Sequence, residues 1–158
     1  MAGKEHHYAV EVRWTGNLGE GTRSYKSYAR THDIVSDGKP TISGSSDPAF
    51  RGDADRWNPE DLMVAAVSAC HKLWYLHLCA VAGVNVVSYV DHAQGVMIED
   101  DRRGGYFTGV TLRPDITITA DSDVAKAAVL HHDAHEKCFI ANSVNFPIRC
   151  EPSIKRQA

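Results

Sequence analysis

The feature that most constrains this chain is one long apolar segment, residues 62–82. A bilayer span needs about 20 apolar residues, so this segment has enough length to cross a membrane. It contains His71, Lys72 and His77, however, and a charge at mid-span costs at least about 2.5 kcal/mol on insertion scales. We therefore predict a helix buried inside a soluble protein, with no membrane as a partner.

Local signals define both ends of this helix. Asn58 can cap it, Pro59 fits the first helical position, and Glu60 and Asp61 place negative charge near the positive end of the helix. Gly83 is a suitable stop. Because apolar residues cover nearly every face, we expect burial on all sides.

The rest of the chain predicts strands and a second helix in an α+β fold, with antiparallel sheet around one long buried central helix. Alternating apolar and polar residues predict strands over residues 8–14, 24–32, 84–90, 106–119 and 144–151. A long loop is expected over 37–54 and a hairpin connection through 100–105. The second helix starts near Asp121 or Ser122, and its apolar stripe runs to Cys138.

Composition narrows the class of protein further. The 158 residues fit a single domain, residues 1–158, and 43% apolar with 23% charged residues is typical of a globular chain. A net charge of −3 gives no general attraction to nucleic acid. Four cysteines are too sparse for a secreted disulfide scaffold, and the first ten residues lack a signal-peptide core. The expected location is the cytoplasm.

Two of the cysteines are candidates for a reactive pair. If both helices pack against the same sheet, Cys70 and Cys138 can face each other, although two unreactive core thiols fit the pattern as well. Cys79 lies on the opposite face of the helix from Cys70, and Cys150 falls on the apolar face of a strand, so we predict structural roles for both. Apolar burial raises a thiol pKa, so a reactive Cys70 needs a nearby cation, for which an arginine is a better candidate than His71.

Metal binding is the main alternative use of these residues. His131 and His135 are four residues apart on one helix face, and Cys138 could add a third ligand. The chain has no CxxC motif, and His135 is better explained as a hydrogen-bonded histidine packed beside Cys138. We therefore predict no metal ion.

Several motifs together resemble the OsmC/Ohr family of thiol peroxidases. Residues 58–62 (NPEDL), 65–66 (AA) and 69–70 (AC) resemble the family's NPEEL…AA…AC segment. Residues 135–138 (HEKC), at the end of a helix and before a strand, resemble its second-cysteine helix. Residues 70–78 and 138–143 resemble an OsmC-like subgroup, and the similarity spans almost the whole chain.

The resemblance implies an intertwined α+β homodimer with two active sites at the interface and no cofactor. It implies reduction of organic hydroperoxides, and sometimes of hydrogen peroxide, with a dithiol or a lipoylated protein as reductant. Cys70 matches the peroxidatic cysteine and Cys138 the resolving one.

Glu60 matches the family's glutamate that holds a catalytic arginine, but the family arginine has no fixed motif. We assign it to Arg51, in the loop just before the glutamate motif; Arg30, Arg56 and Arg23 are the alternatives. A second function fits the same fold, which does not by itself fix an activity. It is a non-enzymatic dimer that binds a hydrophobic ligand or senses oxidation.

Overall fold

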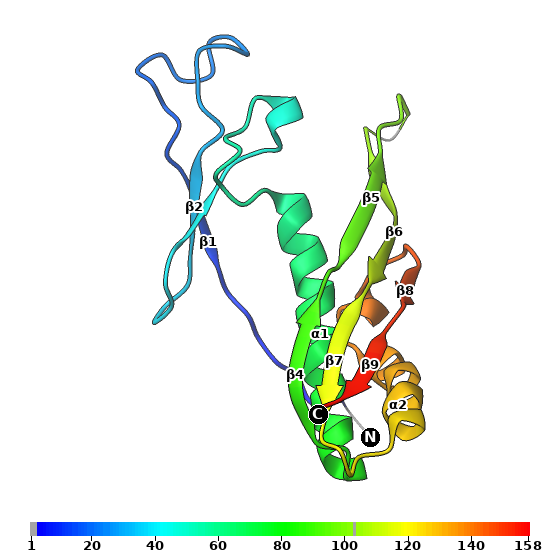
Figure 1. Cartoon of the computed structure of the whole chain (residues 1–158). Helices are drawn as coiled ribbons and strands as arrows, with labels where there is room; N and C mark the ends of the chain where they lie inside the picture. Colours follow the sequence, from blue (N-terminus) through cyan, green and yellow to red (C-terminus); the bar gives the residue numbers. More distant parts are fainter. Residues whose placement is uncertain (1–2, 103) are drawn as a thin grey trace. The chain divides into compact units, whose positions relative to one another are not determined.

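The computed structural model describes residues 3–102 and 104–158. They form an α+β fold, with two α-helices and three three-stranded sheets (Figure 1). The chain divides into two compact units, Met1–Leu62 and Met63–Ala158. The prediction of one domain over residues 1–158 stays a prediction.

The first unit contains one small antiparallel sheet in the order β1-β2-β3. Its strands are β1 (Glu11–Trp14), β2 (His32–Val35) and β3 (Ile42–Gly44), followed by the short 3-10 helix η1 (Pro48–Phe50). Trp14 pairs with His32, and the indole of Trp14 donates a hydrogen bond to the Ala29 carbonyl at 2.9 Å.

Three predictions for this unit were wrong. Residues 24–31 do not form a strand, because a turn closes there with the Ser27 amide donating to the Ser24 carbonyl at 3.1 Å. The expected loop over 37–54 contains β3 and η1. The first strand is shorter than expected, and its residues are exposed rather than half-buried.

Helix α1 (Pro59–Ala82) begins and ends where the sequence predicts. The Asn58 side chain accepts a hydrogen bond from the Asp61 amide at 2.7 Å, and Gly83 follows the helix with a φ of +74°. Such caps satisfy backbone groups that the first and last turns leave unpaired.

Burial of α1 on all sides was a wrong prediction for the single chain. Its buried residues fall four apart on one stripe: Val67, His71, Tyr75 and Cys79. Other apolar residues of the helix are exposed, Leu73 by 63%. By length and composition the helix could cross a membrane, but the core helix of a soluble protein passes the same test, so one such helix is weak support for a span.

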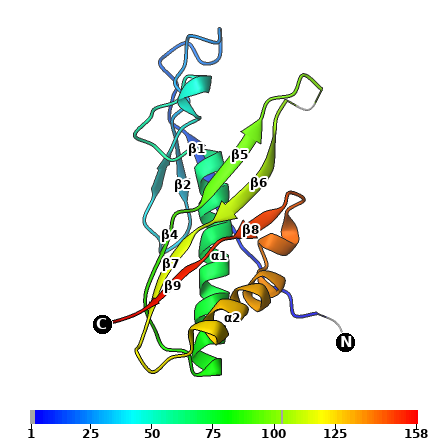
Figure 2. The same cartoon turned by 45° about the vertical axis from the view of Figure 1, so that its right-hand side comes forward.

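The second unit carries two mixed sheets (Figure 2). One has the order β4-β7-β9, with β4 (Val86–Asp91), β7 (Pro114–Ile118) and β9 (Ser153–Arg156). The other has the order β5-β6-β8, with β5 (Gln94–Ile98), β6 (Tyr106–Leu112) and β8 (Ile148–Cys150). Pairs β6/β8 and β7/β9 are parallel, which corrects the expected all-antiparallel sheet.

The strand expected over 106–119 is divided at Arg113 into β6 and β7, which belong to different sheets. The Arg113 amide donates to the Asp91 carboxylate at 2.7 Å. At the point where the strand is interrupted, a side-chain oxygen thus takes the place of a backbone carbonyl of a neighbouring strand as the acceptor. The connection through 100–105, of which residue 103 lies outside the described residues, joins β6 to β5 and not to β4. The strand predicted from residue 144 onward forms only over Ile148–Cys150, as β8. Strand β9 was not predicted.

Helix α2 (Val124–Lys137) supplies the other side of the core, and the 3-10 helix η2 (Ala141–Ser143) follows it. The Asp123 carboxylate caps α2 by accepting from the amides of Ala125 and Lys126, so the helix starts slightly later than predicted. Figures 1 and 2 show α2 beside β9. The core cluster here comprises Tyr75, Cys79, Val84, Ile116, Ile118, Ala127, Leu130 and Ala134.

Replacing Ile116 by Ala tests this core. Ile116 is 1% exposed on the central strand β7, so truncation removes buried area and leaves a cavity. We expect the free energy of unfolding to fall by about 2–5 kcal/mol in a denaturant titration. Val129→Ala, at a position 65% exposed on α2, is the control and should stay within about 0.5 kcal/mol of the parent. Equal effects of the two substitutions would contradict the assigned core.

Candidate active site

The structure brings Cys70 and Cys138 together in the second unit. Cys70 lies on α1, one residue before the buried stripe, and is partly exposed. Cys138 is the C-cap of α2, where its amide donates to the His135 carbonyl at 3.2 Å, and its side chain is 1% exposed. The side chain of Cys70 is near enough to raise the pKa of Cys138, and both cysteines are free.

The two thiols differ in how readily they ionise. Burial raises the pKa of Cys138 to about 11, and the neighbouring Cys70 side chain acts in the same direction. The Ala141 amide, which donates to Cys138 Sγ at 3.5 Å, opposes this rise only in part. At neutral pH Cys138 is therefore a protonated thiol that can donate its S–H to the sulfur of Cys70.

An apolar hollow lies on the same helix face as Cys70. Leu73, Trp74 and His77 line it, at three, four and seven residues beyond Cys70, a spacing that places them on one side of α1. Phe139, the residue after Cys138, packs edge-on against Trp74 with ring centroids 5.5 Å apart. Phe139 is 65% exposed, so the hollow is an open apolar surface that an alkyl or aryl group can cover.

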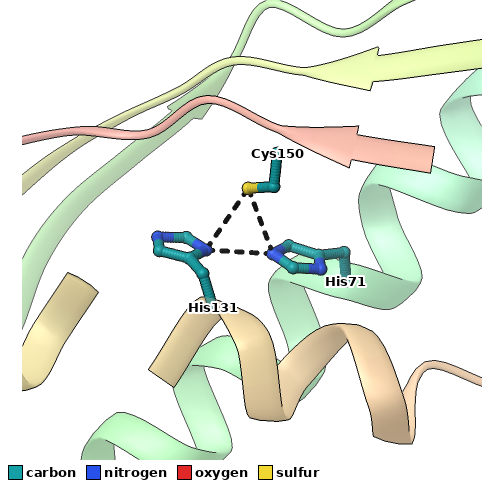
Figure 3. Close-up of side chains that lie close together, drawn as sticks. All are labelled: His71, His131 and Cys150. Atoms are coloured by element: carbon teal, nitrogen blue, oxygen red, sulfur yellow. Dashed lines mark hydrogen bonds between the residues drawn. The ribbon is translucent and has the colours of Figure 1, made fainter. Parts of the chain in front are cut away.

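The other two cysteines lie apart from this pair. Cys79 is buried in the core cluster, as predicted, and burial raises its pKa. Cys150 was expected to be a core residue, but it is only partly buried and contacts two histidines (Figure 3). Its Sγ lies 3.6 Å from His131 Nδ1 and 3.7 Å from His71 Nε2, and burial raises its pKa to about 12.

The histidines are not arranged as the sequence suggested. His131 Nδ1 lies 3.0 Å from His71 Nε2, in a buried contact between α1 and α2. Among the described residues, the cluster that could hold a metal ion combines His71 and His131 with Cys150, and not His131 with His135 and Cys138, the set that the sequence offered as an alternative. Burial lowers the pKa of His71 to about 4 and that of His131 to about 3, so both imidazoles are neutral at pH 7. Sequence reasoning missed the cluster because its members come from three elements.

The arginine candidates lie in the first unit and differ in their partners. Arg30 is held by two tyrosines: it donates to the carbonyls of Tyr28 and Tyr25 at 2.6 and 2.8 Å and lies over both rings. The other two alternatives form ion pairs, Arg56 with Asp53 at 3.4 Å and Arg23 with Glu20 at 3.7 Å.

Arg51 lies farther from the ring of Tyr25 than Arg30 does. It follows η1 with a φ of +66°, which is uncommon for a residue other than glycine. Its guanidinium lies 5.7 Å from the centre of the Tyr25 ring and forms no ion pair within the described chain. Glu60 occupies the first turn of α1. The roles of Arg51 and Glu60 stay predictions.

Comparison with known proteins identifies the family. The sequence profile of the family described as OsmC-like protein matches residues 52–153, more than half of the chain. The chain belongs to the OsmC-like family. Comparison with curated protein sequences gives no match.

Solved structures agree with this family. An OsmC-like protein of unknown function from Vibrio cholerae shares 30% identity and a TM-score of 0.86, over 94% of this chain and 100% of that chain. An OsmC-like protein from Mycoplasma pneumoniae has 12% identity and a TM-score of 0.73, over 96% and 99%. The organic hydroperoxide resistance protein OhrB of Bacillus subtilis has 23% identity and a TM-score of 0.61, over 94% and 98%. The last two likenesses concern the fold alone.

The environments of the four thiols predict their order of alkylation. In the reduced protein at pH 8, iodoacetamide should modify the partly exposed Cys70 first. A thiol with the pKa of Cys138 is about one thousandth thiolate at that pH, and its labelling should speed up as the pH rises toward 11. Peptide mass spectrometry over time measures each site, with buried Cys79 as the slow internal control. Labelling of Cys138 as fast as Cys70 would contradict the assigned environments.

Proposed function

We propose that this protein is a thiol peroxidase that reduces organic hydroperoxides, with Cys70 as the peroxidatic and Cys138 as the resolving cysteine. The observation that carries the proposal is that a partly exposed and a buried thiol, one on α1 and one at the end of α2, are neighbours. Membership in the OsmC-like family supports it, because this family includes the organic hydroperoxide resistance proteins to which the chain is similar.

In the first step the Cys70 thiolate attacks one oxygen of the peroxide. An S–O bond forms, the O–O bond breaks, and the leaving alkoxide takes up a proton to become an alcohol, while Cys70 becomes a sulfenic acid. Cys138 supports this step in the proposal, because its protonated thiol, next to Cys70, can donate a hydrogen bond to the sulfur that must carry negative charge.

In the second step Cys138 attacks the sulfur of the Cys70 sulfenic acid. An S–S bond forms, the S–O bond breaks, and the hydroxyl leaves as water with the proton that Cys138 gives up. The proposed disulfide returns to two thiols by exchange with an external dithiol, for which a small dithiol or a lipoylated protein is the expected reductant.

Substrate preference follows from the surface next to Cys70. Leu73, Trp74 and Phe139 offer apolar and aromatic area there, so an organic substituent gains contacts that hydrogen peroxide cannot make. We therefore propose alkyl and aryl hydroperoxides as the preferred substrates. Hydrogen peroxide is the poorer one.

The partners follow the family pattern. We propose a homodimer, because α1 exposes apolar side chains such as Met63 and Val81 in the single chain although the helix is apolar nearly all round. A second copy would cover them by burying apolar surface. We propose a cytoplasmic location, where thiols stay reduced between turnovers.

Substitution of the two cysteines tests the mechanism. Cys70→Ser should abolish reduction of cumene hydroperoxide, because no thiolate is left to attack. Cys138→Ser should permit one turnover and then accumulate overoxidised Cys70, seen in intact-mass spectra as a gain of about 32 or about 48 Da.

Cys79→Ser is the matched control, since it removes a buried thiol from the same helix and should leave the rate unchanged. Full steady-state activity of Cys70→Ser would contradict the proposal. Unchanged thiols in the parent protein after one equivalent of cumene hydroperoxide would favour the alternative function, a non-enzymatic binding module.

The cation that activates Cys70 is proposed to be Arg51, with Glu60 holding it. A preorganised donor at a developing charge is typically worth about 10²–10³ in rate. Arg51→Ala should therefore slow oxidation of Cys70 about 100-fold in stopped-flow measurements, and Glu60→Gln should slow it less. Arg56→Ala, which removes an ion-paired arginine from the same loop, is the control and should change the rate little. A loss in Arg30→Ala with a normal Arg51→Ala would assign the role to Arg30.

A further inference from the structure

Three potential ligand atoms converge at one point in the second unit. His71 comes from α1, His131 from α2 and Cys150 from the end of β8, and Figure 3 shows the three side chains pointing toward one another. Their ligand atoms lie within 4.8 Å of one another. Both imidazoles are buried, so the cluster is part of the packed interior and not a chance gathering of surface side chains.

The triangle formed by these atoms matches a tetrahedral metal site. A zinc ion with bonds of about 2.0–2.1 Å to nitrogen and about 2.3 Å to sulfur separates two nitrogen ligands by about 3.3 Å and a nitrogen from a sulfur by about 3.6 Å. Here the nitrogens are 3.0 Å apart, and the sulfur lies 3.6 and 3.7 Å from them. Moving the two nitrogens apart by about 0.3 Å gives the distances of a tetrahedral zinc site.

We propose that His71 Nε2, His131 Nδ1 and Cys150 Sγ bind one divalent cation of the zinc class. Two imidazoles and one thiolate are the ligand types that such borderline ions prefer over magnesium or calcium. Three protein ligands leave a fourth position for water or another small ligand. Cys70 and Cys138 take no part, so the site is separate from the proposed peroxidase pair.

The surroundings fix the ligands and also limit the affinity. The ring of Tyr75 stacks on that of His131 with centroids 3.9 Å apart, which holds this imidazole in place. The outer nitrogens, Nδ1 of His71 and Nε2 of His131, are buried without a hydrogen-bond partner in the described part of the chain. Because such outer partners are typically worth 10–100-fold in affinity, we expect weaker binding than in a fully supported structural zinc site. Cys150 is partly exposed, so an ion can reach the site from solvent.

Cobalt(II) is the probe for this site, because a thiolate ligand adds a charge-transfer band and tetrahedral geometry adds visible bands. The reduced, metal-free protein titrated with cobalt should show both features at about one ion per chain, and zinc should remove them. Cys150→Ser should lose the thiolate band, and His131→Asn should weaken cobalt binding by more than about tenfold.

Two matched controls report on the identity of the ligands. Cys79→Ser removes another thiol of the same unit, and His132→Ala removes the exposed histidine next to His131; both should bind cobalt as the parent does. The proposal is overturned by a parent protein without a thiolate band, or by a band that survives Cys150→Ser. It is also overturned by a band lost instead in Cys70→Ser or Cys138→Ser.

X-ray absorption of the parent protein needs no substitution, so it tests the site even if the variants fail to fold. Zinc X-ray absorption of the loaded parent protein should show one sulfur at about 2.3 Å and two nitrogens at about 2.0–2.1 Å from the metal. A shell of oxygen and nitrogen alone would contradict the site. Neither result depends on peroxidase activity, so this proposal and the proposed function can fail separately.

Discussion

The packing of one narrow face of α1 is the constraint on which the second unit depends. Val67, His71, Tyr75 and Cys79 repeat every four residues and are the only α1 residues that are fully buried in the described chain. Tyr75 and Cys79 join the core that also contains strand β7 and helix α2. Because successive helical residues are turned by about 100°, Cys70 lies at the edge of this stripe. The packing that forms the core thus leaves Cys70 partly exposed.

The same stripe contains a polar contact that an apolar core would not need. A buried polar atom without a partner typically costs about 1–3 kcal/mol, and His71 and His131 each leave one nitrogen in this condition. Their remaining nitrogens face each other and the sulfur of Cys150. A hydrophobic residue at either position would avoid the cost, so stability alone does not explain this cluster. The two inward nitrogens form a hydrogen bond with each other, and the proposed cation would take the place of that bond.

What the sequence predicted well rests on short-range signals. The cap at Asn58, the stop at Gly83 and the α2 stripe that leads to Cys138 involve neighbours a few residues apart. The errors come from contacts that are distant in sequence. The break at Arg113 depends on Asp91 and the environment of Cys150 on two helices, and no local pattern contains that information. Because α1 is apolar nearly all round, its sequence likewise does not indicate which face packs against the core.

Both candidate sites depend on the same spacing between α1 and α2. Cys70 and His71 are adjacent on α1, while Cys138 and His131 are seven residues, about two turns, apart on α2. The thiol pair thus contacts the end of α2 and the histidine pair its middle. A disulfide requires its two Cα atoms within about 7 Å, so forming it restrains the end of α2 against α1. Both proposed sites therefore rest on the packing of the same two helices.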